Sequence, residues 1–388
     1  MKYIKEYELY EASATAPALT KRQINWLDKC VDGRWKLNPQ TGLIDVAGNF
    51  NCSNIFVHGN NINDINRYSL KDLKGVKFGD VSGDFNCQYN KLTSLGGAPQ
   101  TVKGNFLCRE NQLTSLVGAP KKVGGYFDCN HNQLTSLVGA PKKVGGYFDC
   151  YGNLLTTLVG APQTVKGYFH CENNQLTTLE GAPQSVGGGF NCQNNQITSL
   201  VGAPRIVGGN FLCNRNQLTS LVGAPQSVGR NFNCGDNQLT SLEGAPQTVD
   251  GDFGCNHNQL TSLDGAPQTV GESFSCMYNQ LTSLVGAPQK VDGFFECNYN
   301  QLTNLEGAPK SVGRDLVCHN NPVSESTLKG IFELTKKGKP YQQALEEFWP
   351  DMSDEDRVLI YKQMPNLSPE DVRKYKALAT YGNIKNYL

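Results

Sequence analysis

Cysteine is the residue type whose spacing in this chain first suggests chemistry, because thiols bind metals, form disulfides and carry redox reactions. Of the 14 cysteines, twelve follow one another at intervals of 21 residues, from Cys87 to Cys318. No CxxC pair is present, and no histidine–cysteine cluster has the spacing of a zinc site. We therefore predict a column of small buried thiols in a reducing compartment, with no metal site and no cofactor.

Carboxylate and imidazole side chains are the other candidates for catalysis. Asp128 and Asp149 occupy the same place in neighbouring units, and paired carboxylates raise one another's pKa in some hydrolases. We expect both to lie in open solvent on a shallow face, and His131 and His170 to lie too far apart to share a metal ion. No glycine-rich phosphate loop precedes a helix. We predict that the chain is not an enzyme, and the alternative is a glycan-binding or hydrolytic role.

A 21-residue repeat, V-x-G-x-F-x-C-x-x-N-x-L-T-S-L-x-G-A-P-x-x, positions all of these residues, as residues 123–143 illustrate. A fixed period of this length indicates a solenoid. F-x-C places two side chains on one side of a short strand, and the leucines after the asparagine fill the interior. The asparagine, from Asn90 to Asn321, can satisfy donors and acceptors of the turning backbone. Gly-Ala-Pro then turns the chain back along the outer surface.

The repeat resembles that of bacterial and viral leucine-rich-repeat proteins, because its residues fall at the offsets of L-x-L-x-x-N-x-L. The resemblance covers twelve units, roughly residues 81–321. It implies a parallel sheet of short strands on a concave face, turns and loops on the convex face, and binding of another macromolecule along the strands. The chain departs from the common pattern where glycine replaces the leucine that often begins the strand, with valine one place earlier. The geometry of strand entry therefore stays open.

The flanks of the repeats differ from them in composition. We predict four regions: a flexible leader over 1–18, an N-terminal cap with a helix and one aberrant repeat over 19–80, the repeats over 81–321, and a helical C-terminal domain over 322–388. Thr20 can cap a helix that runs to about Val31. A strand ending at Cys52 opens the aberrant repeat, where Ile55 replaces the expected asparagine. The C-terminal helices either cover the end of the solenoid or dock a second partner.

The first twelve residues resemble the capsid-targeting leader of internal head proteins in T-even-type bacteriophages. That leader starts with Met-Lys, continues with aromatic and acidic residues, and ends at a prohead-protease site. Leu9-Tyr10-Glu11-Ala12 matches the site, so the resemblance implies a possible processing site between Glu11 and Ala12 and a protein of the virion or the host cytoplasm. A frayed amphipathic N-terminus is the alternative.

Charge and hydropathy disfavour two classes of partner. Lys+Arg and Asp+Glu both number 35, so bulk charge favours neither duplex nucleic acid nor an anionic membrane surface. No apolar run reaches the ~18 residues of a membrane span, and the start lacks the apolar core of a secretory signal. We expect a cytoplasmic protein whose partner is another protein.

The predicted partner-binding surface uses the positions three and one before each cysteine and one and two after it, where we expect exposed side chains. Neighbouring tyrosines there have the composition of interface hot spots. The main site comprises Tyr126, Asp128, His131, Tyr147, Asp149, Tyr151, Tyr168, His170 and Glu172. A secondary patch comprises His257, Met277, Tyr278, Phe294, Glu296 and Tyr299. The alternative is that these are tolerated solvent-facing substitutions.

The sequence thus predicts a non-enzymatic protein-binding solenoid, encoded by a bacteriophage and either carried in the particle or acting on a host protein. One alternative is a structural component of a virion that associates with copies of itself. The other is the glycan-binding or hydrolytic protein introduced above.

Overall fold

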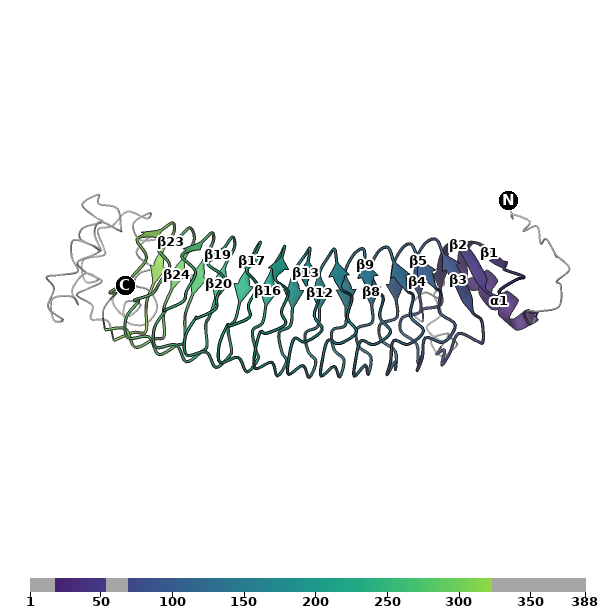
Figure 1. Ribbon diagram of the computed structural model, residues 1–388, viewed down its shortest axis with the longest axis horizontal. Coiled ribbons are helices and arrows are strands. Elements are labelled where there is room, and N and C mark those ends of the chain that lie inside the picture. The colour runs from purple at the N-terminus through teal and green to yellow at the C-terminus, as the bar shows by residue number, and fades with distance from the viewer. Residues whose placement is uncertain (1–17, 54–68, 304, 323–388) are drawn as a thin grey trace, which may run out of the picture. The chain divides into compact units, whose positions relative to one another are not determined.

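The computed structural model describes residues 18–53, 69–303 and 305–322. The chain divides into two compact units, Met1–Leu154 with Gly160–Pro162 and Leu155–Val159 with Gln163–Leu388. Each unit is a stack of turns in which short parallel strands recur with the 21-residue period (Figure 1). Residues 1–17, Ile55 and the predicted C-terminal helices lie outside the described residues. Within the described residues, no helix is both long enough and apolar enough to span a membrane.

The first unit begins with a helix and a β-hairpin. Helix α1 (Lys21–Cys30) starts after Thr20, whose hydroxyl accepts the backbone N–H of Gln23, while the Gln23 side chain accepts the N–H of Thr20. This capping box confirms the predicted helix. Strands β1 (Val31–Leu37) and β2 (Ile44–Asn51) then pair antiparallel. Only the second of these strands was indicated by the sequence pattern.

The aberrant repeat stacks in register with the regular repeats. Strand β2 pairs in parallel with β3 (Phe78–Val81) and β4 (Phe85–Asn86), and Phe50 lies opposite Phe85. The Leu70 N–H donates to Asn90 Oδ1 at 3.0 Å, as the first leucine of a regular turn does to the next asparagine. The longer interval between Cys52 and Cys87 therefore leaves the pairing of Phe50 with Phe85 intact, and the register shifts only between Ile44 and Val46.

Each regular turn contributes two short strands, one containing the valine and one beginning with the phenylalanine. The valine strands are β5 (Thr101–Val102), β7 (Lys122–Val123) and β9 (Lys143–Val144) in the first unit, and β11 (Thr164–Val165), β13 (Ser185–Val186), β15 (Ile206–Val207), β17 (Ser227–Val228), β19 (Thr248–Val249), β21 (Thr269–Val270), β23 (Lys290–Val291) and β25 (Ser311–Val312) in the second. The valine thus belongs to a parallel ladder of its own, and the following glycine lies in a bend between the two strands.

The phenylalanine strands form the second ladder. They are β6 (Phe106–Leu107), β8 (Phe127–Asp128) and β10 (Phe148–Asp149) in the first unit, and β12 (Phe169–His170), β14 (Phe190–Asn191), β16 (Phe211–Leu212), β18 (Phe232–Asn233), β20 (Phe253–Gly254), β22 (Phe274–Ser275), β24 (Phe295–Glu296) and β26 (Leu316–Val317) in the second. Phenylalanine lies opposite phenylalanine in successive turns, with Leu316 taking its place opposite Phe295 in the last, so the pairing repeats the sequence period.

The core of each unit consists of columns of identical side chains. Successive phenylalanine rings stack, with centroids 5.3 Å apart for Phe106 and Phe127 and 5.2 Å apart for Phe232 and Phe253. All the cysteines are buried and free of disulfides, which confirms the predicted thiol column. Several thiols donate to a carbonyl of the next turn, as Cys213 does to Asn233 O at 3.3 Å.

The asparagine column satisfies the turning backbone, as the sequence predicted. Asn111 Nδ2 donates to the carbonyls of Cys87 and Cys108, each at 3.0 Å, and its Oδ1 accepts the Leu92 N–H at 2.9 Å. One buried carboxamide therefore ties two consecutive turns together. The role of this column is structural, and the residues available for binding must lie elsewhere on each turn.

Candidate partner-binding surface

The surface of the phenylalanine strands has four columns of side chains, which we number −3, −1, +1 and +2 from the cysteine of the same turn. Two aromatic members of the −3 column are exposed, with 44% of Tyr126 and 40% of Tyr147 accessible, and the other two, Tyr168 and Phe294, are half-buried. The side chains of the −1 column are half-buried, and those of the +1 column are half-buried or buried in most turns. The prediction that all four columns are exposed is therefore wrong for −1 and +1. The −1 side chains fold back onto their own loop, as Asp149 Oδ1 does by accepting the Tyr151 N–H at 3.0 Å.

The +2 column has a left-handed backbone in every regular turn that the structure describes. The dihedral φ is 49° at His131, 55° at Tyr278 and 56° at Tyr299. Other turns have residues that favour this region, such as Gly152 and Asn173. An ordinary L-residue loses about 1–2 kcal/mol there, so each aromatic side chain in this column has a conformational cost.

The −3 column forms a ladder of hydrogen bonds wherever it contains Asp, Asn or Ser. Asp84 Oδ1 accepts the Asn105 N–H at 2.7 Å, and Asn105 Oδ1 accepts the Tyr126 N–H at 2.7 Å. In the second unit Asp252 Oδ1 accepts the Ser273 N–H at 2.9 Å. A tyrosine cannot continue this ladder, because its hydroxyl lies at the far end of the ring.

Six predicted site residues come together in the first unit, and we name them the tyrosine–aspartate cluster: Tyr126, Asp128, His131, Tyr147, Asp149 and Tyr151. The rings of Tyr126 and Tyr147 stack with centroids 4.5 Å apart and an interplanar angle of 7°. Gly146 provides the room, since a Cβ there would collide with the Tyr126 ring. Two exposed rings in contact form a flat apolar surface with hydroxyls at its edge.

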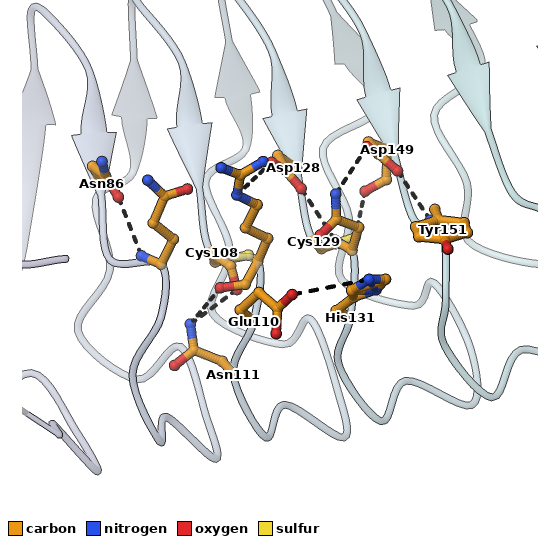
Figure 2. Close-up of polar contacts among 12 residues, drawn as sticks. Asn86, Cys108, Glu110, Asn111, Asp128, Cys129, His131, Asp149 and Tyr151 are labelled. Carbon is orange, nitrogen blue, oxygen red and sulfur yellow. Dashed lines mark hydrogen bonds and ion pairs between the residues drawn. The ribbon is translucent and has the colours of Figure 1, made fainter. Parts of the chain in front are cut away.

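The two aspartates lie beside this surface and are less exposed than predicted (Figure 2). Only 14% of the Asp128 side chain is accessible, so the expectation of open solvent was wrong for it. Its Oδ1 accepts the Asn130 N–H at 3.2 Å, and Oδ2 lies 3.7 Å from Arg109 Nε. Asn130 Nδ2 donates to Asp149 Oδ2 at 3.0 Å. Burial, and then the charge of Asp149, raise the pKa of Asp128 to about 7.

His131 lies on the other side of the cluster, between Glu110 and Tyr151 (Figure 2). Its Nε2 is 3.9 Å from Glu110 Oε1, and its ring centroid is 4.7 Å from that of Tyr151. Glycine at position 152 accommodates this imidazole, because a Cβ there would lie 2.7 Å from His131 Nδ1. The cluster therefore combines aromatic surface, carboxylates and an imidazole, which together suit recognition of a polar and apolar protein surface.

The remaining three residues of the predicted main site lie together in the second unit. The rings of Tyr168 and His170 are 5.8 Å apart, and His170 Nδ1 is 3.3 Å from Glu172 Oε1. Glycines at 188 and 189 leave space for the Tyr168 ring, since a Cβ on either would lie 2.9 Å from it.

The secondary patch contains a continuous stack of rings, which we name the aromatic row: His257, Tyr278 and Tyr299. Centroid separations are 4.3 Å between the first two and 4.2 Å between the last two, with interplanar angles of 9° and 8°. Met277 Sδ accepts Asn298 Nδ2 at 3.0 Å, and the Arg314 guanidinium lies over the Phe294 ring at 5.1 Å. Glu296 is half-buried beside them, and burial raises its pKa.

Sequence reasoning missed three neighbours of these sites: Tyr89, Arg109 and Glu110. The guanidinium of Arg109 lies 5.2 Å above the Tyr89 ring and bridges it to Asp128. Aligning the units by column would have placed Tyr89 at +2 and Arg109 at +1 beside the predicted residues. In the part of the chain that the structure describes, no three His, Cys, Asp or Glu side chains are grouped so as to hold a metal ion.

The stacked parallel strands, the buried leucine columns and the asparagine ladder define the chain as a leucine-rich-repeat solenoid. No protein-family model matches it, and no curated protein does. Among solved structures it is similar to YopM, a leucine-rich effector protein from Yersinia pestis, with 20% identity and a TM-score of 0.42 over 61% of this chain and 72% of that one. It is also similar to YopM from Yersinia enterocolitica WA-314, with 16% identity and a TM-score of 0.39 over 63% of this chain and 73% of that one.

Proposed function

We propose that the chain is a non-enzymatic protein-binding solenoid that captures its partner on the strand face, at the tyrosine–aspartate cluster. The supporting observation is that aromatic side chains occupy column positions at which other turns have Asp, Asn or Gly for structural reasons. Tyr126 and Tyr147 occupy the column in which Asp84 and Asn105 accept backbone N–H groups. His131 adopts the left-handed backbone that Gly152 adopts without strain. The free energy gained when a partner buries these aromatic side chains offsets the missing hydrogen bonds of the −3 column and the backbone strain at His131.

The test replaces Tyr126 and Tyr147 together with asparagine, the residue found at position 105 of the same column. The partner is captured from a lysate of the native host, identified by mass spectrometry, purified and titrated against both forms. We expect at least about tenfold weaker binding, because interface tyrosines in contact commonly act as hot spots. Thermal stability should not fall, since asparagine suits the column.

The control is Val138→Ser, which removes an apolar side chain that is 52% exposed on the Gly-Ala-Pro side of the turn. It should bind as the unmodified chain does. Equal affinity of the double tyrosine variant and the unmodified chain would refute the proposed site. Concentration-dependent light scattering would instead favour the self-assembling structural role, and specific retention or turnover on a glycan array would favour the carbohydrate role.

We also propose a bacteriophage setting, in which the protein enters the virion or acts in the host cytoplasm. Its support is the resemblance of the leader around Glu11 and Ala12, which lie outside the described residues. Mass spectrometry of the protein from purified particles should find copies that begin at Ala12. An intact Met1 in every copy would remove this support.

A further inference from the structure

Two phenol rings of the aromatic row face each other across adjacent turns of the second unit. The ring centroids of Tyr278 and Tyr299 are 4.2 Å apart, and the ring planes are 8° from parallel. Desolvation, and then a hydrogen bond between the two hydroxyls, raise the pKa of Tyr278. Because the hydroxyls are bonded and the rings are nearly parallel, the two side chains point the same way. The ortho carbons beside one hydroxyl therefore lie opposite those of the other ring.

Stacked phenols are arranged for oxidative coupling. When a phenol loses one electron and its proton, the unpaired electron spreads over the oxygen and the ortho and para carbons. The para carbon of tyrosine carries the Cβ, so the ortho carbons are the free positions. The orbitals that hold the unpaired electron are perpendicular to the ring, and stacking directs those of one ring at the other. Two such radicals held in contact react without having to diffuse together.

Both rings can be oxidised from solvent, since 41% of Tyr278 and 40% of Tyr299 are accessible. The sulfur groups of the same turns are less accessible. The thiols of Cys276 and Cys297 are fully buried, and burial raises the pKa of both, so neither is a thiolate at neutral pH. Met277 is half-buried. The two phenols are therefore more open to a one-electron oxidant than the sulfur groups beside them.

We propose that Tyr278 and Tyr299 form a site of oxidative modification, at which a dityrosine bond joins two adjacent turns. The oxidant is hydrogen peroxide acting through a haem peroxidase, which takes one electron and one proton from each phenol. The radicals join through one ortho carbon of each ring, and the hydrogen on each of these carbons moves to the ring oxygen, which restores both phenols. Two tyrosines and one hydrogen peroxide thus give one dityrosine and two water molecules.

The bond would close a loop of one 21-residue period and tie two turns of the solenoid together. Turns of a solenoid are stabilised by their neighbours, so a covalent link between two of them should make that part of the stack more resistant to unfolding. Thiol reductants cleave disulfides but leave a carbon–carbon bond intact. The link would therefore persist in the reducing compartment that the free cysteines predict.

Stacking distinguishes this pair from a tyrosine with no phenol beside it. Tyr89 lies in the same +2 column, but its ring faces the Arg109 guanidinium at 5.2 Å, and the next residue of the column is Glu110. A radical on Tyr89 therefore has no phenol opposite it in the following turn. Tyr126 and Tyr147 do stack, at 4.5 Å, so we expect them to couple as well when no partner covers them.

The test treats the purified full chain with a haem peroxidase and dilute hydrogen peroxide, and then cleaves it after glutamate. Residues 273–296 and 297–306 become separate peptides, each with one member of the pair. Mass spectrometry should find the two peptides joined, with a mass two hydrogens below their sum. Dityrosine fluorescence should appear in chains that remain monomeric on a denaturing gel. In concentrated urea, where the stack is lost, the joined peptide should be at least about tenfold less abundant.

Two variants separate this pair from the other tyrosines. Tyr299→Phe keeps a stacked ring but has no phenol to oxidise, so the joined peptide should be lost. Tyr89→Phe, the control in the same column, should give the joined peptide in unchanged yield. After oxidation, the unmodified chain should have a higher urea midpoint than Tyr299→Phe, because only the former gains the link.

Absence of the joined peptide from the native chain, equal yields in native and urea-treated chains, or links mainly between different chains would each overturn the inference. So would equal losses in Tyr89→Phe and Tyr299→Phe. A urea midpoint no higher than that of oxidised Tyr299→Phe would overturn the role of the bond as a link between turns. The site needs no partner, so its failure leaves the test of the tyrosine–aspartate cluster intact.

Discussion

Asp128 links protonation to folding, because its pKa in the folded chain is about 7 and that of a free aspartate is 3.8. A raised carboxyl pKa means that the folded state holds the proton more tightly than the unfolded state does. The stabilisation from that proton is complete below the unfolded pKa and is lost as the pH rises through the folded value. Stability should therefore fall between about pH 4 and about pH 7 and level off above.

Replacing Asp128 with asparagine should remove this part of the pH dependence. Asparagine forms the same turn in this column, where Asn191 Oδ1 accepts the Gln193 N–H at 3.2 Å. The free energy of unfolding from urea titrations should show the variant gaining on the order of 2 kcal/mol over the unmodified chain between about pH 5 and about pH 8. Asp236→Asn, at an exposed carboxylate, is the control and should parallel the unmodified chain. A constant difference between Asp128→Asn and the unmodified chain at every pH would contradict the assignment.

Part of this site could be predicted from side-chain types alone. The tyrosines and aspartates were placed correctly in neighbouring turns, because one period maps each onto the next. The left-handed backbone at +2 was not anticipated from Tyr89 and Glu110, although Gly152, Asn173 and Asn194 in the same column are residue types that favour it. The burial of Asp128 was also missed, because it depends on Asn130 and Arg109 packing over the carboxylate.

The strands show why some elements follow from the sequence and others do not. The phenylalanine strands were predicted because F-x-C alternates buried and outward side chains. The valine strands are two residues long and lie between proline and glycine, a pattern typical of turns, so only pairing with neighbouring turns identifies them. Strand β1 was missed although its charged residues alternate with Val31, Trp35 and Leu37, because it follows the helix directly and has a glycine at position 33.

The Gly-Ala-Pro turn sets the spacing between turns and should not tolerate a side chain at its glycine. Gly223 has φ of 94°, and a Cβ there would lie 2.7 Å from the backbone of Leu200 and Val201. Gly223→Ala should destabilise the chain by about 2 kcal/mol or more in urea unfolding. Gly254→Ala is the control, since the nearest atoms to its Cβ would be side-chain atoms of Asn233 and Asn256 at 3.4 Å or more, and it should cost less than about 0.5 kcal/mol. Similar losses in both variants would refute this account of the turn.

At the scale of the whole chain, the reactivity of the cysteine thiols can show whether the turns unfold together or one after another. Each turn of a solenoid contacts only its neighbours, so stability is a sum of local terms and of interfaces between adjacent turns. The 14 thiols are all buried. Burial raises the pKa of Cys87 and of Cys318 to about 12, which leaves almost no reactive thiolate at neutral pH. Labelling a thiol therefore requires the opening of its turn.

Iodoacetamide should leave the native chain unlabelled at pH 8 and label every cysteine in concentrated urea. At intermediate urea, peptide mass spectrometry should find Cys30 and Cys318 alkylated before Cys213, because turns near the ends of a stack have fewer interfaces to lose. The pKa of Cys30 is raised only to about 11, which adds to its earlier reaction. Cys213 also donates to Asn233 O in the next turn, so its labelling requires the loss of that bond. Simultaneous labelling of all three would show instead that the turns unfold as one cooperative block, and rapid labelling without urea would contradict the buried thiol column itself.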